Sequence, residues 1–129
     1  MNLSKGEQGQ AIVEMALVLP LLLLLLFGII EMGQVGYAYV TVSNAARSGV
    51  RVATTGGTDQ DIQNAVIVAA PTLSQTELTT IITPTETNRQ SGQNVQVQVS
   101  YHVQLIIPLI SSILPNPFPI SSTLSMRVE

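Results

Sequence analysis

Sixteen consecutive residues without a charge separate Glu14 from Glu31, and they include six consecutive leucines at positions 21–26. Extended back to Ala11, this run reaches the roughly 17–25 residues that a helix needs to cross a bilayer. A helix that is apolar on every side belongs in lipid or in the centre of a helical bundle. We therefore predict a transmembrane helix over residues 10–31 that holds the rest of the chain at a membrane. Pro20 should kink or loosen this helix, as membrane helices tolerate.

Glu14 does not suit an ordinary anchor, because it lies inside the apolar segment near its N-terminal end. A carboxylate in hydrocarbon is energetically unfavourable, so an acid within a membrane span is a functional hypothesis by default. Alternatively, Glu14 lies at the level of the lipid headgroups and interacts favourably with the helix dipole as a first-turn acid. Position alone leaves both interpretations open.

Gly9 precedes Glu14 by five residues and closes a short polar stretch, residues 1–9. This arrangement resembles the signal of type IV pilin-like proteins, in which a membrane peptidase cuts after a glycine and a glutamate is fifth in the mature chain. The resemblance makes residues 1–9 a leader peptide and places the cut between Gly9 and Gln10. The new α-amino group would be mostly protonated at neutral pH, about 6 Å from Glu14 along the helix axis. The ammonium and the carboxylate could then pair within one chain or between neighbouring subunits of a helical stack.

Composition excludes several classes of function. The chain has no cysteine, so it has neither a disulfide framework nor a thiolate metal site. Charged residues make up 10% of the chain and the net charge is −3, which is not basic enough for a nucleic-acid surface. A cleaved secretory signal is disfavoured, because the apolar run is long, contains an acid and has no small-residue cleavage site directly after it. Lys5 weakly favours a cytoplasmic N-terminus.

Beyond Glu31 the pattern becomes amphipathic and predicts that the helix continues to about residue 54. Apolar or small residues recur at spacings of three and four on one face, at Val35, Tyr39, Val42, Ala46, Gly49, Val50 and Ala53. Tyr37 and Tyr39 suit an aromatic belt at the membrane interface, but for Tyr39 we favour a place in the core. Gly56 and Gly57 should end the helix. Thr58 or Asp59 should then cap a second helix that Pro71 ends, with Ile62, Ala65, Val66 and Ala69 on its apolar face.

The remainder alternates with a period of two and predicts an antiparallel sheet. Residues 78–83 form a plausible short strand, residues 95–105 the clearest one, and residues 121–129 a closing strand with Leu124, Met126 and Val128 inward. Residues 106–120 contain four prolines, which exclude a regular helix or strand across the whole segment. This segment either covers the end of the core, which we favour, or offers an interaction patch.

The sequence offers no arrangement of residues suited to catalysis. The single histidine, His102, falls on the polar face of its strand. The other acid–base candidates, Asp59, Asp61, Glu77 and Glu86, are linked by no nucleophile–base pairing, phosphate loop or metal-ligand spacing. We therefore predict that the protein is not an enzyme, has no catalytic residues and binds no cofactor and no metal.

Taken together, the motifs resemble TadE-like proteins of the tight-adherence (Tad/Flp) type IV pilus system. The resemblance rests on the opening residues 9–33, on Ser43–Arg51, on the alternating strand, on the proline-rich segment and on Met126–Glu129. It implies an α+β, pilin-like fold: a long N-terminal helix packed on a small antiparallel sheet, with residues 32–129 as the extracytoplasmic domain and one short extra helix.

The resemblance also implies a function, that of a minor pseudopilin. Such a protein is processed by the prepilin peptidase at Gly9, is held in the inner membrane and takes part in assembling an adhesion pilus; the Gly9 and Glu14 equivalents determine processing and assembly. Its partners would be the peptidase, other pilins or pseudopilins, the inner-membrane assembly platform and lipid. Met15 after the glutamate, and the domain after the helix, differ from the major pilin of the system and favour an accessory subunit. The alternative is a single-pass, membrane-anchored binding or scaffold protein that never enters a pilus.

Overall fold

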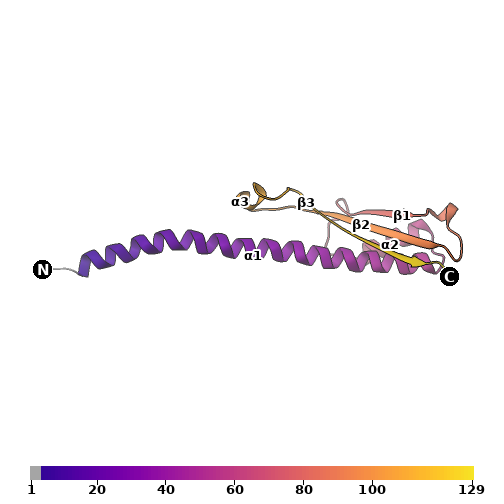
Figure 1. Ribbon diagram of the computed structural model, residues 1–129, viewed down its shortest axis with the longest axis horizontal. Coiled ribbons are helices and arrows are strands. Elements are labelled where there is room, and N and C mark those ends of the chain that lie inside the picture. The colour runs from indigo at the N-terminus through magenta and orange to yellow at the C-terminus, as the bar shows by residue number, and fades with distance from the viewer. Residues whose placement is uncertain (1–3) are drawn as a thin grey trace.

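The computed structural model describes residues 4–129, and its dominant feature is one long helix (Figure 1). Helix α1 spans Ser4–Thr54 and has 51 residues, so it is about 75 Å long at 1.5 Å per residue. It continues through Pro20 as a single helix. We expected it to begin at residue 10, and that prediction was wrong: the described leader residues 4–9 are helical as well, with Glu7 favourably placed in the first turn. The first three leader residues lie outside the described part of the chain.

The two halves of α1 have different surroundings, as Figure 1 shows. The N-terminal half extends away from the rest of the protein, whereas the C-terminal half packs against the second helix and the sheet. The buried face of the second half consists of small or β-branched residues, namely Ala38, Val42, Ala45, Ala46, Gly49, Val50 and Ala53. The predicted core position of Tyr39 was wrong: its side chain is 52% exposed, and Ala38 takes the buried place beside it.

Helix α2, Asp59–Ala69, begins and ends where the sequence predicts. Gly56 adopts a φ of +81°, a left-handed conformation that glycine reaches without steric penalty, and this ends α1. Thr58 then forms a capping box with Asp61: the Thr58 hydroxyl accepts from the Asp61 N–H at 3.1 Å, and the Asp61 carboxylate accepts from the Thr58 N–H at 3.0 Å. Ile62 and Val66 are fully buried in the core.

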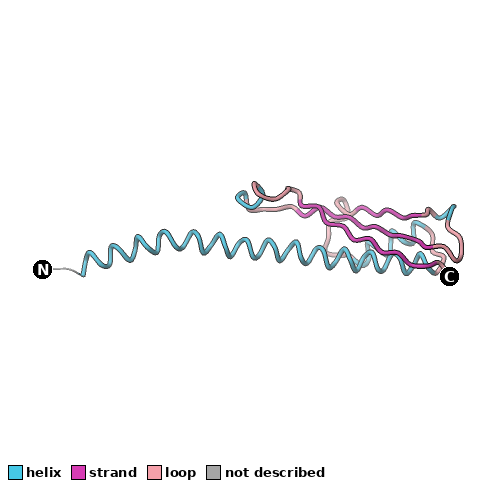
Figure 2. The backbone as a smooth tube through the Cα atoms, viewed as in Figure 1, coloured by secondary structure: helices cyan, strands magenta, loops and turns pink. Residues whose placement is uncertain are grey.

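Three antiparallel strands form a sheet in the order β1-β2-β3 (Figure 2). Strand β1 spans Thr79–Thr83, the central β2 spans Asn94–Val103 and β3 spans Phe118–Arg127. In the register, Val97 of β2 lies opposite both Ile82 and Leu124. Val95, Val97 and Val99 are fully buried, so the alternation predicted for this strand is confirmed. Together with the buried faces of α1 and α2, these valines make one small core.

The proline-rich segment differs most from expectation. Its middle contains a short helix, α3 (Pro108–Ser111), and its last residues, 118–120, already belong to β3. The favoured prediction that this segment covers the end of the core was wrong for its first part, because Ile106, Leu109 and Ile113 are all more than half exposed, whereas Ile120 at its end is buried in the core. Met126, predicted to point inward, is also 47% exposed on the edge strand β3. In Figure 1 the segment projects from the sheet and runs back beside the middle of α1.

Candidate assembly site

The three residues singled out by the sequence lie close together on the N-terminal half of α1. Gly9, Gln10 and Glu14 are all exposed. The Gln10 amide nitrogen Nε2 donates to Glu14 Oε1 at 3.3 Å, across one turn of the helix. A Cβ atom added at Gly9 would meet no described atom within 4 Å, so packing among the described residues does not require a glycine there. The segment therefore presents an acid on an otherwise apolar, uncovered surface.

None of the described residues covers the helix around this acid. Large apolar side chains from Ile12 to Ile30 are between 42% and 74% exposed, including the six consecutive leucines at 21–26. Among the described residues, α1 is the one helix long and apolar enough to cross a membrane, and none of its most apolar stretch is buried inside the molecule. Residues 11–30 would span about 30 Å, which matches the hydrocarbon core of a bilayer. This half of α1 is a candidate membrane anchor.

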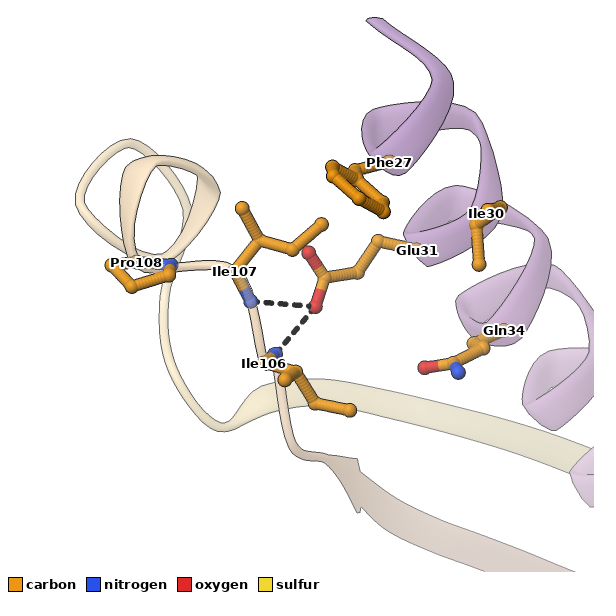
Figure 3. Close-up of a pocket in the computed structure, with 7 residues that line it drawn as sticks. All are labelled: Phe27, Ile30, Glu31, Gln34, Ile106, Ile107 and Pro108. Atoms are coloured by element: carbon orange, nitrogen blue, oxygen red, sulfur yellow. Dashed lines mark hydrogen bonds between the residues drawn. The ribbon is translucent and has the colours of Figure 1, made fainter. Parts of the chain in front are cut away.

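Glu31, at the end of the apolar run, makes a buried contact that the sequence did not predict. Its side chain is only 3% exposed, which makes it the buried acid of the described chain. Figure 3 shows it reaching from α1 to the segment after β2. There Oε1 accepts hydrogen bonds from the backbone N–H groups of Ile106 and, at 3.2 Å, Ile107. Glu31 thus fixes the proline-rich segment to α1 just where the predicted membrane span ends.

An apolar pocket surrounds the Glu31 carboxylate. Its walls are Phe27, Ile30, Gln34, Ile106, Ile107 and Pro108, and Figure 3 shows them converging from the two segments. Within the described part of the chain, the second oxygen, Oε2, is buried without a hydrogen-bond partner. A buried carboxylate oxygen without a hydrogen bond is energetically unfavourable unless the other oxygen of the same carboxylate is strongly hydrogen-bonded. Only the two N–H donors of the proline-rich segment compensate it.

Two of the acids considered above as catalytic candidates, Asp59 and Glu86, form contacts within the fold. Asp59 forms an ion pair with the nearly buried side chain of Arg89, and its Oδ2 accepts from the Glu86 N–H at 3.1 Å. Glu86 in turn accepts from the Asp59 N–H at 3.3 Å, which joins the 3₁₀ turn Glu86–Asn88 to the start of α2. His102 is half-buried on β2. Among residues 4–129, no three histidine or acidic side chains gather in a group that could hold a metal ion.

The fold and the site define a class: an α+β protein whose long N-terminal helix is half bare, apolar and acid-bearing, and half packed on a small antiparallel sheet. The family model of TadE-like proteins matches residues 9–51 of this chain. Over these residues the chain is similar to TadE-like proteins, and this similarity supports involvement in the Tad pilus system.

The matched segment is informative about which residues carry the resemblance. It begins at Gly9, contains Glu14 and Glu31, and ends at Arg51, three residues before the end of α1. The sheet, the proline-rich segment and Met126–Glu129 lie outside it, so the resemblance expected for those parts stays a prediction. Neither the curated proteins nor the solved structures contain a match to this chain.

Proposed function

We propose that this chain is a minor pseudopilin of a Tad/Flp-type pilus. It is cut by the prepilin peptidase between Gly9 and Gln10, is held in the inner membrane with its N-terminus cytoplasmic, and takes part in the biogenesis of an adhesion pilus. Its role in this proposal is structural, not catalytic. The observation that carries the proposal is the exposed Glu14 one helical turn beyond Gln10 on an uncovered apolar helix.

An unpaired Glu14 carboxylate is energetically unfavourable in lipid, and this favours association with a subunit that supplies a positive partner. An acid at the centre of a membrane helix is unfavourable by roughly 2.5–3.5 kcal/mol on insertion scales, and less near the ends of the span. The α-amino group that cleavage creates on Gln10 would offer Glu14 a positive partner. Within one chain the helix holds these groups about 6 Å apart along its axis. An amine from a neighbouring subunit can approach more closely, since none of the described residues covers the face around Glu14. Pairing between subunits then favours association.

The position of Gly9 supports cleavage. Gly9 and Gly6 lie in the first turns of α1, and both are exposed. Each glycine lowers helix stability by roughly 0.8–1.0 kcal/mol relative to alanine, and the first turn of a helix already lacks part of its hydrogen bonds. This end of α1 can therefore unwind at little energetic expense and present an extended backbone to a peptidase.

The folded domain favours an accessory subunit. Residues 55–129 add a second helix and a three-stranded sheet beside α1, so the protein is much wider at this end than at the other (Figure 1). Its partners in this proposal are other pilins or pseudopilins along the apolar half of α1 and the assembly platform in the inner membrane.

Determination of the mature N-terminus tests the processing step. The chain is expressed in cells that contain a prepilin peptidase, and mass spectrometry identifies its first residue, which we expect to be Gln10. Gly9→Ala should block the cut, whereas Gly6→Ala should leave it intact. The two variants are matched, because an added Cβ meets nothing within 4 Å at either position. Recovery of uncut wild-type chain would overturn the proposal in favour of a single-pass binding or scaffold protein.

A second pair of variants tests assembly. Glu14→Gln should reduce cross-linking to other pilin subunits while membrane insertion is unchanged. Glu7→Gln, which neutralises another exposed acid of the same helix but within the leader, should assemble normally. Equal cross-linking by both variants would show that the Glu14 carboxylate has no part in subunit association.

A further inference from the structure

The segment from Ile106 to Leu114 lies at the depth of the predicted membrane span. A Cβ atom on Gly28 would be 3.8 Å from Ile110 Cδ1, so the tip of the segment contacts α1 three residues before Glu31. An apolar groove between the two is lined by Leu25, Gly28, Ile29, Met32, Ile110 and Ile113. At 1.5 Å per residue, Gly28 is about 5 Å inside the end of the span. If α1 crosses the bilayer over residues 10–31, this tip lies below the headgroups.

The outer surface of the segment is apolar. Ile106, Leu109 and Ile113 are all more than half exposed, and Ile113 is 78% exposed. No Asp, Glu, Lys or Arg occurs between His102 and Arg127. A surface of this kind in water would be an unusual exposed patch, whereas at the edge of a bilayer it meets a matching solvent.

Most backbone N–H groups of the segment, although not that of Leu109, have a partner within the described protein, which suits a lipid environment. The N–H groups of Ile106 and Ile107 donate to Glu31, and that of Leu105 donates to the side chain of Asn116. Residues 110–114 all donate to carbonyl groups within the segment. Positions 108, 115 and 117 are prolines, which have no N–H group. The hydroxyls of Ser111 and Ser112 donate back to carbonyls at 2.9 and 2.7 Å.

We infer that residues 106–114 form a second membrane contact, which inserts into the half of the bilayer nearest the folded domain, beside α1. The ligand of this surface is the acyl chains of the lipid. Interfacial elements of this kind typically enter the boundary between headgroups and acyl chains by about 5–10 Å, in agreement with the depth of Ile110. The contact would fix the tilt and rotation of the folded domain on the membrane, which a single helix cannot do. This inference rests on the membrane anchoring in the proposed function.

The natural absence of cysteine allows a direct test by single-cysteine labelling. Three positions have nearly equal exposure in the protein: Ile113 in the segment (78%), Val68 on α2 (77%) and Leu21 in the membrane span (74%). Each is replaced by cysteine in the full chain, labelled with an environment-sensitive fluorophore and reconstituted in phosphatidylcholine vesicles. Fluorescence loss is measured with nitroxide groups on the lipid acyl chains and, separately, with aqueous iodide.

We expect the label at position 113 to lose fluorescence to the acyl-chain nitroxides, as the label at position 21 does, and to resist iodide. The label at position 68 should show the reverse. Quenching of position 113 by iodide alone would overturn the inference and leave the membrane helix intact. Protection of position 113 from both quenchers would also overturn it, since a second copy of the chain would then cover the segment. If position 21 itself escapes the nitroxides, membrane anchoring fails and the inference fails with it.

Discussion

The contact of Glu31 with the proline-rich segment gives the sharpest prediction. In Glu31→Ala, the N–H groups of Ile106 and Ile107 lose the acceptor that both share. Each amide left without a hydrogen-bond partner in an apolar environment destabilises the closed segment by roughly 1–3 kcal/mol. Removal of the buried carboxylate offsets part of this loss, because the unfavourable desolvation of that carboxylate disappears with it. We expect local opening of the segment to become easier by about 2–3 kcal/mol.

Hydrogen exchange monitored amide by amide measures this opening. Since 1.4 kcal/mol corresponds to a factor of ten, the amides of Ile106 and Ile107 should exchange about 30- to 140-fold faster in the alanine variant. The Val97 amide, in the centre of the sheet, serves as the internal reference and should not change. Full-length protein in detergent or in lipid is suitable for this measurement.

Glu31→Gln separates the hydrogen bonds from the charge. Glutamine keeps a side-chain carbonyl oxygen that can accept from both N–H groups, although neutral hydrogen bonds are roughly half as strong as those to a carboxylate. Its effect should therefore lie between that of wild type and alanine. Unchanged exchange at both amides in Glu31→Ala would refute the idea that Glu31 holds the segment against α1.

Two further predictions concern the folded domain. Gly49→Ala should destabilise it by about 1–2 kcal/mol in chemical denaturation, because the new Cβ would be 2.8 Å from Val66 Cγ2 and overpacking outweighs the gain in helix propensity. The control is Gly36→Ala, whose new Cβ meets nothing within 4 Å and which should be neutral or stabilising. Equal effects of the two substitutions would contradict the packing argument. Hydrogen bonds from the backbone and side chain of Thr58 hold the pKa of Asp61 below its ordinary value of 3.8. The stability from this group is therefore present above about pH 3.8 and is lost as the pH falls through the lower, folded-state pKa. Asp61→Asn should thus be less stable than wild type at neutral pH, with a difference that shrinks in thermal unfolding below pH 3.8; a constant difference would contradict it.

The features that could be predicted from the sequence depend on neighbours along the chain. The membrane helix follows from an uninterrupted apolar run, and the boundary between the helices follows from Gly56 and the capping box of Thr58. Strand β2 follows from strict alternation of valine with polar residues. Each of these signals is contained in a window of a few turns or one strand, so no knowledge of distant contacts was needed.

The features that were missed depend on distant parts of the chain. Glu31 finds its donors 75 and 76 residues away, and they are backbone N–H groups, which leave no trace in side-chain pattern. The buried face of α1 is largely the predicted one, but Tyr39 is exposed and Ala38 and Ala45 are buried in addition. The closeness of α2 and the sheet favours small residues at these positions. The exposure of Ile106 and Ile113 likewise depends on where the segment lies relative to α1.

Glu14 and Glu31 lie at opposite ends of the apolar part of α1 and differ in how their carboxylates are bound. Both are acids at the ends of one apolar run, where a free carboxylate is unfavourable. Glu31 is held within its own chain by two backbone donors to Oε1 and is buried, so it is not accessible to another subunit. Among the described residues, Glu14 has the exposed Gln10 amide as its one hydrogen-bond partner, and none of them covers the surface on which it lies. The Glu31 carboxylate is therefore bound within the chain, whereas the Glu14 carboxylate is accessible to another subunit. Contact at Glu14 can contribute binding energy between subunits, and for this reason we propose the assembly contact there.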